Sequence, residues 1–448
     1  MTHDLISRYG GNAPRYTSYP TAPHFSADIG ETPYRARLAS LAPEPISLYV
    51  HIPFCDTLCW FCGCHTKITR RYEPVLDYVD ILILEMAELA RAAPPDMRMS
   101  HMHWGGGSPT LLTPKDTLRL ARTAKDLFSP TEAFEFAVEI DPRETGEDRI
   151  AALAEAGLTR ASIGVQDFDP QVQKAINRTQ SFEGTAAAAH SLRNHGVQSL
   201  NLDLMYGLPY QTLDRTLGTM EHALTLAPDR VALFGYAHVP WMKAHQRLIP
   251  EDALPGPEAR REAADAAAAL LLSAGYRQIG IDHFALPGDS LSLASDAGML
   301  RRNFQGYTTD QATTLLPVGA SSIGRLPDMF IQNEPSLKSH ARRVTEGHLP
   351  IAKGVLLSPD DQLRASIIER LMCAFSVDLA AICTLFGADI ACLSDAFPRL
   401  RQMEQDGLLT HSRSQITVTQ IGRPYIRQIA ACFDTYFSQG TARHSSTV

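Results

Sequence analysis

Four cysteines lie within ten residues of one another in the segment HIPFCDTLCWFCGCH. Cys55, Cys59 and Cys62 follow the spacing C-x3-C-x2-C, and Cys64 comes two residues later. So tight a group, in a chain without a recognisable secretion signal, indicates a metal site or reactive thiols rather than a disulfide framework. Thiolates suit soft metals and iron–sulfur clusters. A loop that gives three thiolates to a [4Fe–4S] cluster leaves one iron free to bind a substrate or cofactor.

A zinc site is the alternative interpretation of the same segment. Zinc sites usually combine two C-x2-C pairs, or cysteines with spaced histidines. His51 and His65 flank the loop, so a mixed cysteine–histidine site remains open from the residues alone. The spacing favours the iron–sulfur cluster.

The elements that would position this loop follow from the pattern of apolar residues. Short β-branched runs alternate with segments such as YVDILILEMAELARAA and TLRLARTAKDLF, whose apolar positions recur at helical spacing. This alternation predicts parallel strands joined by helices, in an α/β fold that forms a partial or complete parallel (β/α) barrel. An open doubly wound sheet is the alternative. The candidate strands span 46–53, 99–106, 133–141, 160–167, 199–207, 230–237 and 276–285.

Polar and glycine residues gather where the candidate strands end. GGGSPT (105–110) closes the second strand, Glu139 lies in the third, Gln166 near the end of the fourth and Asp203 in the fifth. Barrel enzymes carry their chemistry at the C-terminal ends of the strands. We therefore expect these residues to meet the cysteine loop at one mouth of the barrel.

Three parts are predicted along the chain. Residues 1–45 are rich in Pro, Tyr, Ser and Thr without clear periodicity, which predicts an extended N-terminal arm that covers the substrate rather than supporting the fold. Residues 46–349 form the barrel domain. Residues 350–448 form a small, mostly helical domain of winged-helix character, and its charge favours an accessory module over a DNA-binding one.

The overall composition limits the partners. The net charge is −8, from 41 basic and 49 acidic residues, which argues against a nucleic-acid partner. The N-terminus has no apolar run typical of a signal peptide. The Ala/Leu-rich run at 263–274 contains Asp265 and is too short to span a bilayer. We expect a cytoplasmic monomer that does not contact membranes.

Nine longer motifs extend beyond the cysteine loop, namely PRYTSYPTA (14–22), SLYVHIPFC (47–55), CWFCGC (59–64), HWGGGSPT (103–110), VEIDPRE (138–144), GVQDF (164–168), NLDLMYGLP (201–209), RNFQGYTT (302–309) and CFDTY (432–436). Together they resemble those of one family, the oxygen-independent coproporphyrinogen III oxidases of the radical S-adenosylmethionine (SAM) superfamily. The resemblance extends over almost the whole chain. It implies anaerobic oxidative decarboxylation of two propionates of coproporphyrinogen III to vinyl groups, giving protoporphyrinogen IX in haem biosynthesis.

The same resemblance implies the cofactors, a [4Fe–4S] cluster and two SAM molecules. It identifies Cys55, Cys59 and Cys62 as the cluster ligands and Cys64 as a further cysteine of the family with a catalytic role. Cleavage of SAM would give the 5′-deoxyadenosyl radical that takes a hydrogen atom from the propionate β-carbon. An electron donor such as flavodoxin or ferredoxin is implied as the protein partner.

The resemblance also assigns two sets of SAM contacts. The SAM on the cluster would contact Tyr49, Gly106, Glu139 and Ile323. The second SAM would contact Phe61, Gly107, Ser108, Gln166, Arg178, Asp203 and Ala237. Core packing explains the apolar members of these sets equally well. The polar residues inside apolar strands are more informative, because buried polar groups need partners.

Arg15, Arg301 and Arg302 are candidates for pairing with propionates, because guanidinium binds carboxylate in a bidentate manner. Two other functions share the radical SAM core, namely a haem chaperone and a methyltransferase. Tyr16 and Tyr19 in the arm, together with Cys64, favour the oxidase.

Overall fold

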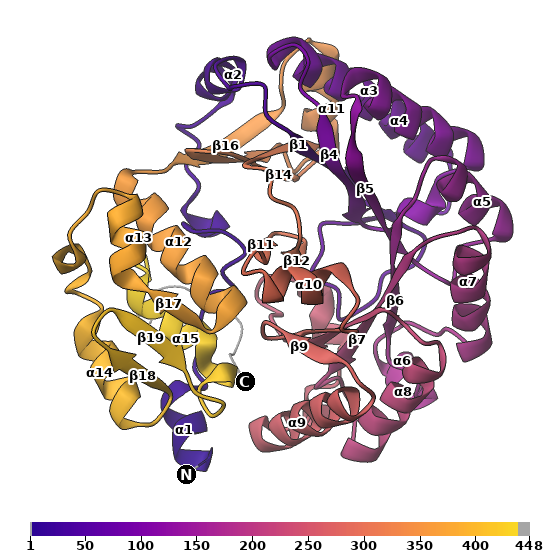
Figure 1. The fold of residues 1–448 in the computed structure, drawn as a ribbon. Coiled ribbons are helices and arrows are strands. Elements are labelled where there is room, and N and C mark those ends of the chain that lie inside the picture. Colours follow the sequence, from indigo (N-terminus) through magenta and orange to yellow (C-terminus); the bar gives the residue numbers. More distant parts are fainter. Residues whose placement is uncertain (1, 438–448) are drawn as a thin grey trace.

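The computed structural model describes residues 2–437 and arranges most of them around one curved sheet of twelve strands (Figure 1). Seven neighbouring strands are parallel, which confirms the predicted α/β class. In their order across the sheet they are β13 (Thr314–Val318), β1 (Ile46–Ile52), β4 (Met99–Gly106), β5 (Pro130–Ile140), β6 (Arg160–Gln166), β7 (Ser199–Tyr206) and β8 (Arg230–Gly235).

Helices cover the outer side of this curved sheet (Figure 1). Their N-terminal caps are local sequence signals, as at Thr113, whose hydroxyl accepts the backbone N–H of Asp116 ahead of a helix that starts with proline. The helices between and after the parallel strands are α3 (Glu73–Ala92), α4 (Pro114–Leu127), α5 (Glu147–Glu155), α6 (Pro170–Ala175), α7 (Phe182–Asn194), α8 (Leu213–Thr225) and α9 (Pro257–Ser273).

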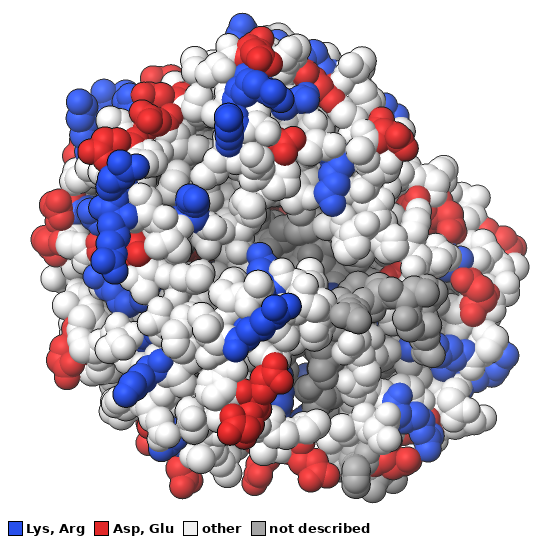
Figure 2. Space-filling view, turned by 180° about the vertical axis from the view of Figure 1, so that it is seen from behind, with Lys and Arg blue, Asp and Glu red and all other residues white. Residues whose placement is uncertain are grey.

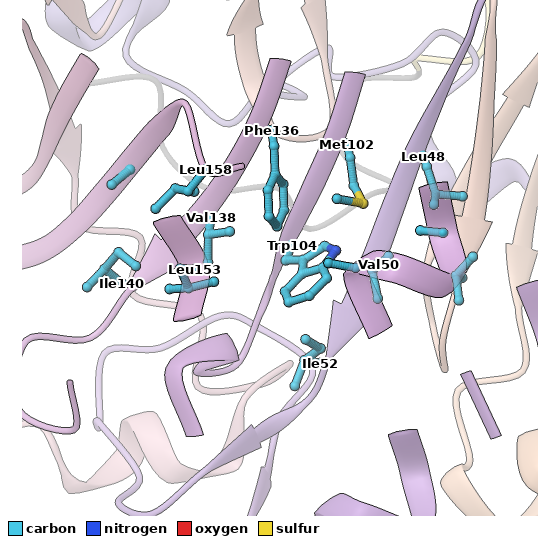
Figure 3. Close-up of a cluster of buried hydrophobic side chains, with 14 of the residues drawn as sticks. Leu48, Val50, Ile52, Met102, Trp104, Phe136, Val138, Ile140, Leu153 and Leu158 are labelled. Carbon is cyan, nitrogen blue, oxygen red and sulfur yellow. The ribbon is translucent and has the colours of Figure 1, made fainter. Parts of the chain in front are cut away.

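The strands sort their side chains by face, because successive residues of a strand point to opposite sides. Val50, Trp104 and Phe136 are buried in the core between sheet and helices (Figure 3). Polar residues such as His103 and Glu139 alternate with them and line a cavity on the other face. Truncating a side chain like Trp104, which is fully buried, costs about 3–5 kcal/mol of stability. The apolar face therefore supports the sheet, while the inner face stays available for chemistry.

The strand order of the sheet is open at both ends, so the structure has the partial barrel of the two predicted forms. In the described residues its strand order ends at β16 (Ile351–Leu356) on one side and β9 (Arg277–Ile279) on the other. Between β13 and β16 lie β14 (Ile323–Leu326) and β15 (Met329–Asn333), which pair in antiparallel fashion. Pro317 stands inside the parallel strand β13, and the apolar run around it was not predicted as a strand.

The seventh predicted strand, 276–285, is wrong as one continuous parallel strand. It divides into β9 and β10 (His283–Ala285), and β10 pairs antiparallel with both β8 and β9. The chain turns at Gly280, which has φ +58°, and a Cβ there would lie 2.2 Å from the Tyr307 hydroxyl. Only glycine fits this turn without displacing Tyr307.

The N-terminal arm contains α1 (Thr2–Tyr9) and α2 (Glu31–Ala39), two helices that the sequence reading did not predict. The expectation that the arm does not support the fold is also wrong. Tyr16 and Tyr19 are buried in the apolar core of the C-terminal region, together with Leu5 and Tyr9. The Tyr16 hydroxyl donates to Asp434 Oδ2 at 3.0 Å within that core. Tyrosine rings supply the apolar area that makes this segment part of the packing.

The C-terminal region contains short helices and a three-stranded antiparallel sheet in the order β17, β19, β18. The predicted boundary at 349/350 needs correction, because β16 extends the main sheet by pairing with β15. The separate core begins after it. Its elements are α12 (Pro359–Ala374), β17 (Ser376–Asp378), α13 (Leu379–Leu385), α14 (Phe397–Gln405), β18 (Leu409–Ser412), β19 (Gln415–Val418) and α15 (Ile426–Ala430).

Four short strands and two helices complete the strands and α-helices of the described residues. These are β2 (Phe54–Cys55), β3 (Lys67–Ile68), β11 (Arg301–Asn303), β12 (Gly306–Thr308), α10 (Ser290–Asp296) and α11 (Leu337–Thr345). On the rear face, basic and acidic side chains are interspersed (Figure 2). Across residues 2–437, no helix combines the length and the apolar character needed to cross a membrane.

Candidate active site

The cysteine loop begins directly after β1, at the C-terminal ends of the parallel strands. Cys55 ends the short strand β2, which pairs in parallel with β3 and so closes the base of the loop. The amide of Thr69 donates to the carbonyl of Cys55 at 2.9 Å, and the amide of Cys62 donates to the carbonyl of Cys59 at 3.2 Å. Cys59 is buried, and Cys55 and Cys62 are half-buried. The three predicted ligands therefore lie on one short, internally bonded loop at the expected mouth.

Distant segments hold the outer part of this loop through its carbonyl groups. Gln246 Nε2 donates to the carbonyl of Phe61 at 2.9 Å. The Lys243 ammonium lies 3.0 Å from the carbonyl of Cys64. His245 contacts the Cys62 carbonyl at 2.8 Å. These bonds fix the path of the backbone while leaving the thiols available.

Two arginines place positive charge beside the Cys59 sulfur. Arg143 Nη2 is 3.7 Å and Arg178 Nη1 3.6 Å from Cys59 Sγ. Both guanidinium groups also pair with Asp141, at 2.6 Å and 3.1 Å. N–H groups directed at a ligand sulfur stabilise its negative charge. Arg143 was not among the predicted site residues, although its place in the VEIDPRE motif could have indicated it.

The thiols influence one another electrostatically. The neighbouring Cys64 thiol lowers the pKa of Cys62 to about 7, although burial acts in the opposite direction. Burial, with the other loop thiols, raises the pKa of Cys55. Cys64 itself is exposed, and its amide donates to Cys62 Sγ at 3.4 Å. The lowered pKa of Cys62 favours the thiolate form, which is the form that binds a soft metal.

The histidines that suggested a zinc site have other partners. His51 uses both ring nitrogens, with the Tyr49 hydroxyl at 3.0 Å and the His65 carbonyl at 3.0 Å. Burial lowers the pKa of His51 to about 4, so the ring is neutral. In the described part of the chain, no three His, Cys, Asp or Glu side chains converge as a site for a single ion. Cluster ligands need not converge in this way, because each binds a different iron.

The glycine run after β4 lets backbone segments approach closely. A Cβ on Gly105 would lie 2.5 Å from a carboxylate oxygen of Glu139, and one on Gly107 would lie 2.5 Å from the Phe54 carbonyl. Gly106 has φ +105°, which a residue with a side chain rarely adopts. The amide of Ser108 donates to the Phe54 carbonyl at 2.7 Å. The run therefore packs against the base of the cysteine loop.

Glu139 stands at the end of β5, between the glycine run and the inner cavity. Its carboxylate accepts the amide of Gly106 at 3.1 Å and lies 3.4 Å from His103 Nε2. Burial alone would raise the pKa of Glu139, but the contacts with His103 and Gly106 outweigh it and lower the pKa. An ionised carboxylate at this position can bind a cationic or hydroxyl group of a ligand.

Asp203 lies on β7 and lines the same cavity of about 180 Å³ as Glu139. It accepts hydrogen bonds from Ser162 Oγ at 3.0 Å and Asn201 Nδ2 at 2.8 Å. Burial, with the charge of Glu139, raises the pKa of Asp203 to about 6. Asn201 Oδ1 is buried without a hydrogen-bond partner. Glu139, Asp203 and Asn201 Oδ1 therefore present hydrogen-bond acceptors to the cavity, a set that suits donor groups such as the ribose hydroxyls or the ammonium of SAM.

Gln166 and Arg178 form a separate pair near the cysteine loop. A Cβ on Gly164 would lie 3.0 Å from Arg178 Nη2 and 3.3 Å from Gln166 Nε2, so both side chains lie over that glycine. Arg178 also donates to the Gly164 carbonyl at 2.6 Å. Gln166 has φ +69°, a strained backbone conformation for a residue with a side chain.

The remaining predicted SAM contacts lie at three places. Tyr49, on β1, stacks on the His103 ring at 5.8 Å between centroids. Phe61 and Ala237 are joined by Gln246, whose amide donates to both carbonyls. Ile323, on β14, packs against the apolar cluster of Phe25 and Phe330.

Comparison with known proteins identifies the class of protein to which this site belongs. Residues 49–223 match the model of the radical SAM superfamily, and residues 357–425 match the HemN C-terminal domain. The chain is 46% identical to the oxygen-independent coproporphyrinogen III oxidase of Bradyrhizobium diazoefficiens, over 100% of both chains. It is 40% identical to the enzyme of that name from Escherichia coli, over 97% of this chain and 95% of the relative.

The solved structure of the Escherichia coli coproporphyrinogen III oxidase, described as a radical SAM enzyme, superposes with a TM-score of 0.91. The two share 39% identity over 94% of this chain and 98% of that one. Fold and cysteine loop together define a radical SAM protein, a class that carries a [4Fe–4S] cluster and binds SAM. Within that class, the chain belongs to the family of oxygen-independent coproporphyrinogen III oxidases.

Proposed function

We propose that this chain converts two propionates of coproporphyrinogen III to vinyl groups and so forms protoporphyrinogen IX. Each conversion removes one hydrogen atom, one electron and CO2 from a propionate side chain. The hydrogen atom passes to the 5′-deoxyadenosyl radical, and the electron passes to an external one-electron acceptor. The observation that carries the proposal is identity of 46% over the full chain to an oxidase of this name, with all three loop cysteines present. Full-length similarity of this degree favours the oxidase over the haem chaperone and the methyltransferase.

We assign the thiolates of Cys55, Cys59 and Cys62 as the ligands of the [4Fe–4S] cluster. Bound there, the cluster with SAM supplies the 5′-deoxyadenosyl radical that removes the hydrogen atom. Arg143 and Arg178 balance the thiolate charge, and Glu139 binds the SAM at the cluster. Cys64, exposed beside the loop, is assigned a catalytic role.

An anaerobic assay tests this function. The reconstituted protein, with coproporphyrinogen III, SAM and a chemical reductant, should form the two-vinyl product, which chromatography resolves from the substrate. Two molecules of 5′-deoxyadenosine should accompany each product. Absence of the vinyl product from cluster-loaded protein would exclude the oxidase. Methylated product, or haem binding without turnover, would indicate one of the alternatives.

A second SAM is part of the proposal. Its site would include Gln166, Arg178 and Asp203, together with Phe61, Gly107, Ser108 and Ala237. Support comes from the polar capacity beyond Glu139, since Asp203 and the unpaired Asn201 Oδ1 would gain partners. Equilibrium dialysis without oxygen should give close to two SAM per chain, and Asp203→Ala should reduce this towards one. One SAM per wild-type chain would remove the second site.

The remaining partners follow from the chemistry. An external protein such as flavodoxin or ferredoxin would reduce the cluster. We place the enzyme in the cytoplasm, in keeping with its eight free cysteines, and propose that it acts as a monomer. Sedimentation of the cluster-loaded protein tests the oligomeric state.

A further inference from the structure

A second cavity of about 250 Å³ lies beside the C-terminal ends of β7 and β8. Three parts of the chain enclose it. Arg15 comes from the arm, Arg260 from α9 and Arg427 from α15, and Tyr236 and Ala237 line it from the end of β8. We call it the arginine pocket. Its size is below the roughly 300–1,000 Å³ typical for a whole ligand, so it suits one edge of a larger molecule.

The charge of the arginine pocket is strongly one-sided. Six arginines line it, against two aspartates: Arg15, Arg260, Arg261, Arg302, Arg423 and Arg427 face Asp265 and Asp282. The two aspartates neutralise only part of this charge. Asp265 pairs with Arg261, one of the six arginines, at 2.7 Å, and Asp282 Oδ1 lies 2.7 Å from His283 Nδ1. The pocket therefore carries an excess of positive charge that its own carboxylates do not balance.

Some of this hydrogen-bonding capacity is unused. Arg302 is 8% exposed, and its Nε and Nη1 have no hydrogen-bond partner. Arg260 Nη2 donates to the Tyr236 carbonyl at 2.8 Å, yet its Nε is unpartnered as well. Buried donors without partners cost about 1–3 kcal/mol each, and more when charged. Such groups persist where a ligand completes them.

The arginines also repel one another. Burial, followed by the charges of Arg15 and Arg302, lowers the pKa of Arg427 to about 9. The backbone holds the group together, since Arg427 Nε donates to the Pro14 carbonyl at 2.9 Å and Arg302 Nη2 to the Arg15 carbonyl at 3.4 Å. An anion that enters the pocket would relieve this repulsion.

The arginine pocket adjoins the cysteine loop without being part of the Glu139–Asp203 cavity. Gln246 connects the two regions, because its amide donates to Ala237 on the pocket wall and to Phe61 in the loop. Aromatic and apolar residues, among them Phe234 and Phe284, alternate with the arginines in the wall. Guanidinium groups bind carboxylates in a bidentate manner, and apolar walls accept a pyrrole ring.

We propose that the arginine pocket binds the two propionates of coproporphyrinogen III that the reaction leaves intact. This assignment rests on the proposed function and extends it to the residues that orient the substrate. Anchors on the retained carboxylates serve both decarboxylations, because these groups are unchanged between the first and the second. The reacting propionates then extend away from the pocket, towards the cysteine loop.

Binding of two stable porphyrins separates retained from reacting propionates. Coproporphyrin III carries four propionates, whereas protoporphyrin IX carries only the two that the reaction retains. The cluster-loaded wild type, Arg302→Gln and Arg15→Gln are titrated with each porphyrin, and quenching of porphyrin fluorescence reports binding. Each variant should weaken both porphyrins by about tenfold, the loss expected for one charge-assisted hydrogen-bonded pair. Arg302→Lys keeps the positive charge but loses the bidentate guanidinium group. Its affinity for both porphyrins should lie between those of the wild type and Arg302→Gln.

Arg277→Gln is the matched control, because Arg277 pairs with Asp296 on the surface outside the pocket. It should bind both porphyrins like the wild type. Arg15 is exposed, so Arg15→Gln tests the pocket even if Arg302→Gln fails to fold. Cluster absorbance and the unfolding temperature identify a folding failure.

Three results would overturn the proposal. Weaker binding of coproporphyrin III alone would assign the arginines to the reacting propionates. Unchanged affinity for both porphyrins in both glutamine variants would show that the pocket does not bind carboxylates. Failure of the wild type to bind either porphyrin would also show that the pocket does not bind carboxylates. The anaerobic turnover assay is independent of these titrations, so normal turnover with any of these results rejects the pocket assignment alone.

Discussion

The cysteine loop takes its three predicted ligands from eight consecutive residues, 55–62, whereas the arginine pocket takes its side chains from positions 15, 260, 302 and 427. Both lie at the C-terminal ends of the parallel strands. The loop is closed at its base by the pairing of β2 with β3, while the pocket exists only where arm, barrel and C-terminal region meet. The base of the loop is therefore set by its own residues, although Gln246 and its neighbours hold the outer part, whereas every side of the pocket depends on a different part of the chain.

The largest expected effect is loss of the cluster on changing one of its ligands. Cys55→Ala, Cys59→Ala and Cys62→Ala should each abolish the [4Fe–4S] absorbance and all turnover, since each thiolate holds one iron and only three ligands from the chain hold the cluster. Cys64→Ala should keep the cluster but lose decarboxylation. Anaerobic absorbance spectra and iron content measure the first effect. A fully assembled cluster in any ligand variant would overturn that ligand assignment, and full turnover of Cys64→Ala would make Cys64 a bystander.

Deletion of residues 1–24 should disrupt the arginine pocket but leave the cysteine loop intact. The truncation removes Arg15 and exposes the C-terminal core that Tyr16 and Tyr19 cover. We expect the cluster absorbance to persist while porphyrin binding is lost. The unfolding temperature should fall by several degrees, because each buried aromatic side chain contributes about 1.5–3 kcal/mol. An unchanged unfolding temperature would show that the arm only covers the substrate.

The cavity that Glu139 and Asp203 line should show a pH dependence of intermediate size. The pKa of Asp203 is raised to about 6 in the folded protein, from an ordinary value of 3.8. The folded state therefore binds the proton of the Asp203 carboxyl more tightly than the unfolded state does. The contribution of this proton to the free energy of unfolding is complete below about pH 4 and is lost as the pH rises through about 6. Between pH 5 and 7 the wild type should lose about 1–1.5 kcal/mol of stability relative to Asp203→Asn.

Apparent unfolding temperatures of both proteins at pH 5 and pH 7 measure this difference. Every other titrating group is common to the two proteins, so the comparison isolates Asp203. Identical pH dependence in both would show that Asp203 does not titrate in this range.

The smallest effect is expected at a surface ion pair outside both regions. Arg277 lies 2.5 Å from Asp296, but both side chains are about half exposed. Exposed pairs of this kind are worth about 0–1 kcal/mol, because water screens the charges and two long side chains lose freedom. Arg277→Gln should change the unfolding free energy by about 0.5 kcal/mol or less. A loss of several kcal/mol would mean that surface charges matter as much as the buried arginines.

Local pattern in the sequence determined the fold class, the cysteine loop and the strand ends that carry Glu139, Gln166 and Asp203. Spacing along one strand or one loop is enough for these features, because their geometry is set by neighbours in the chain. The same reasoning failed at 276–285, where Gly280 turns the chain against Tyr307, a partner distant in sequence. It also missed the helices of the arm.

Only the tertiary structure decided which polar residues share a cavity. Glu139 and Asp203 meet on the inner face, while Gln166 and Arg178 lie together over Gly164 beside Cys59. Among the arginines suggested from sequence, Arg15 and Arg302 line the arginine pocket, whereas Arg301 pairs with Glu369. Arg260 and Arg427 could not be predicted as their partners. Long-range packing determines the separations between such side chains, and the identities of their neighbours in the sequence do not encode them.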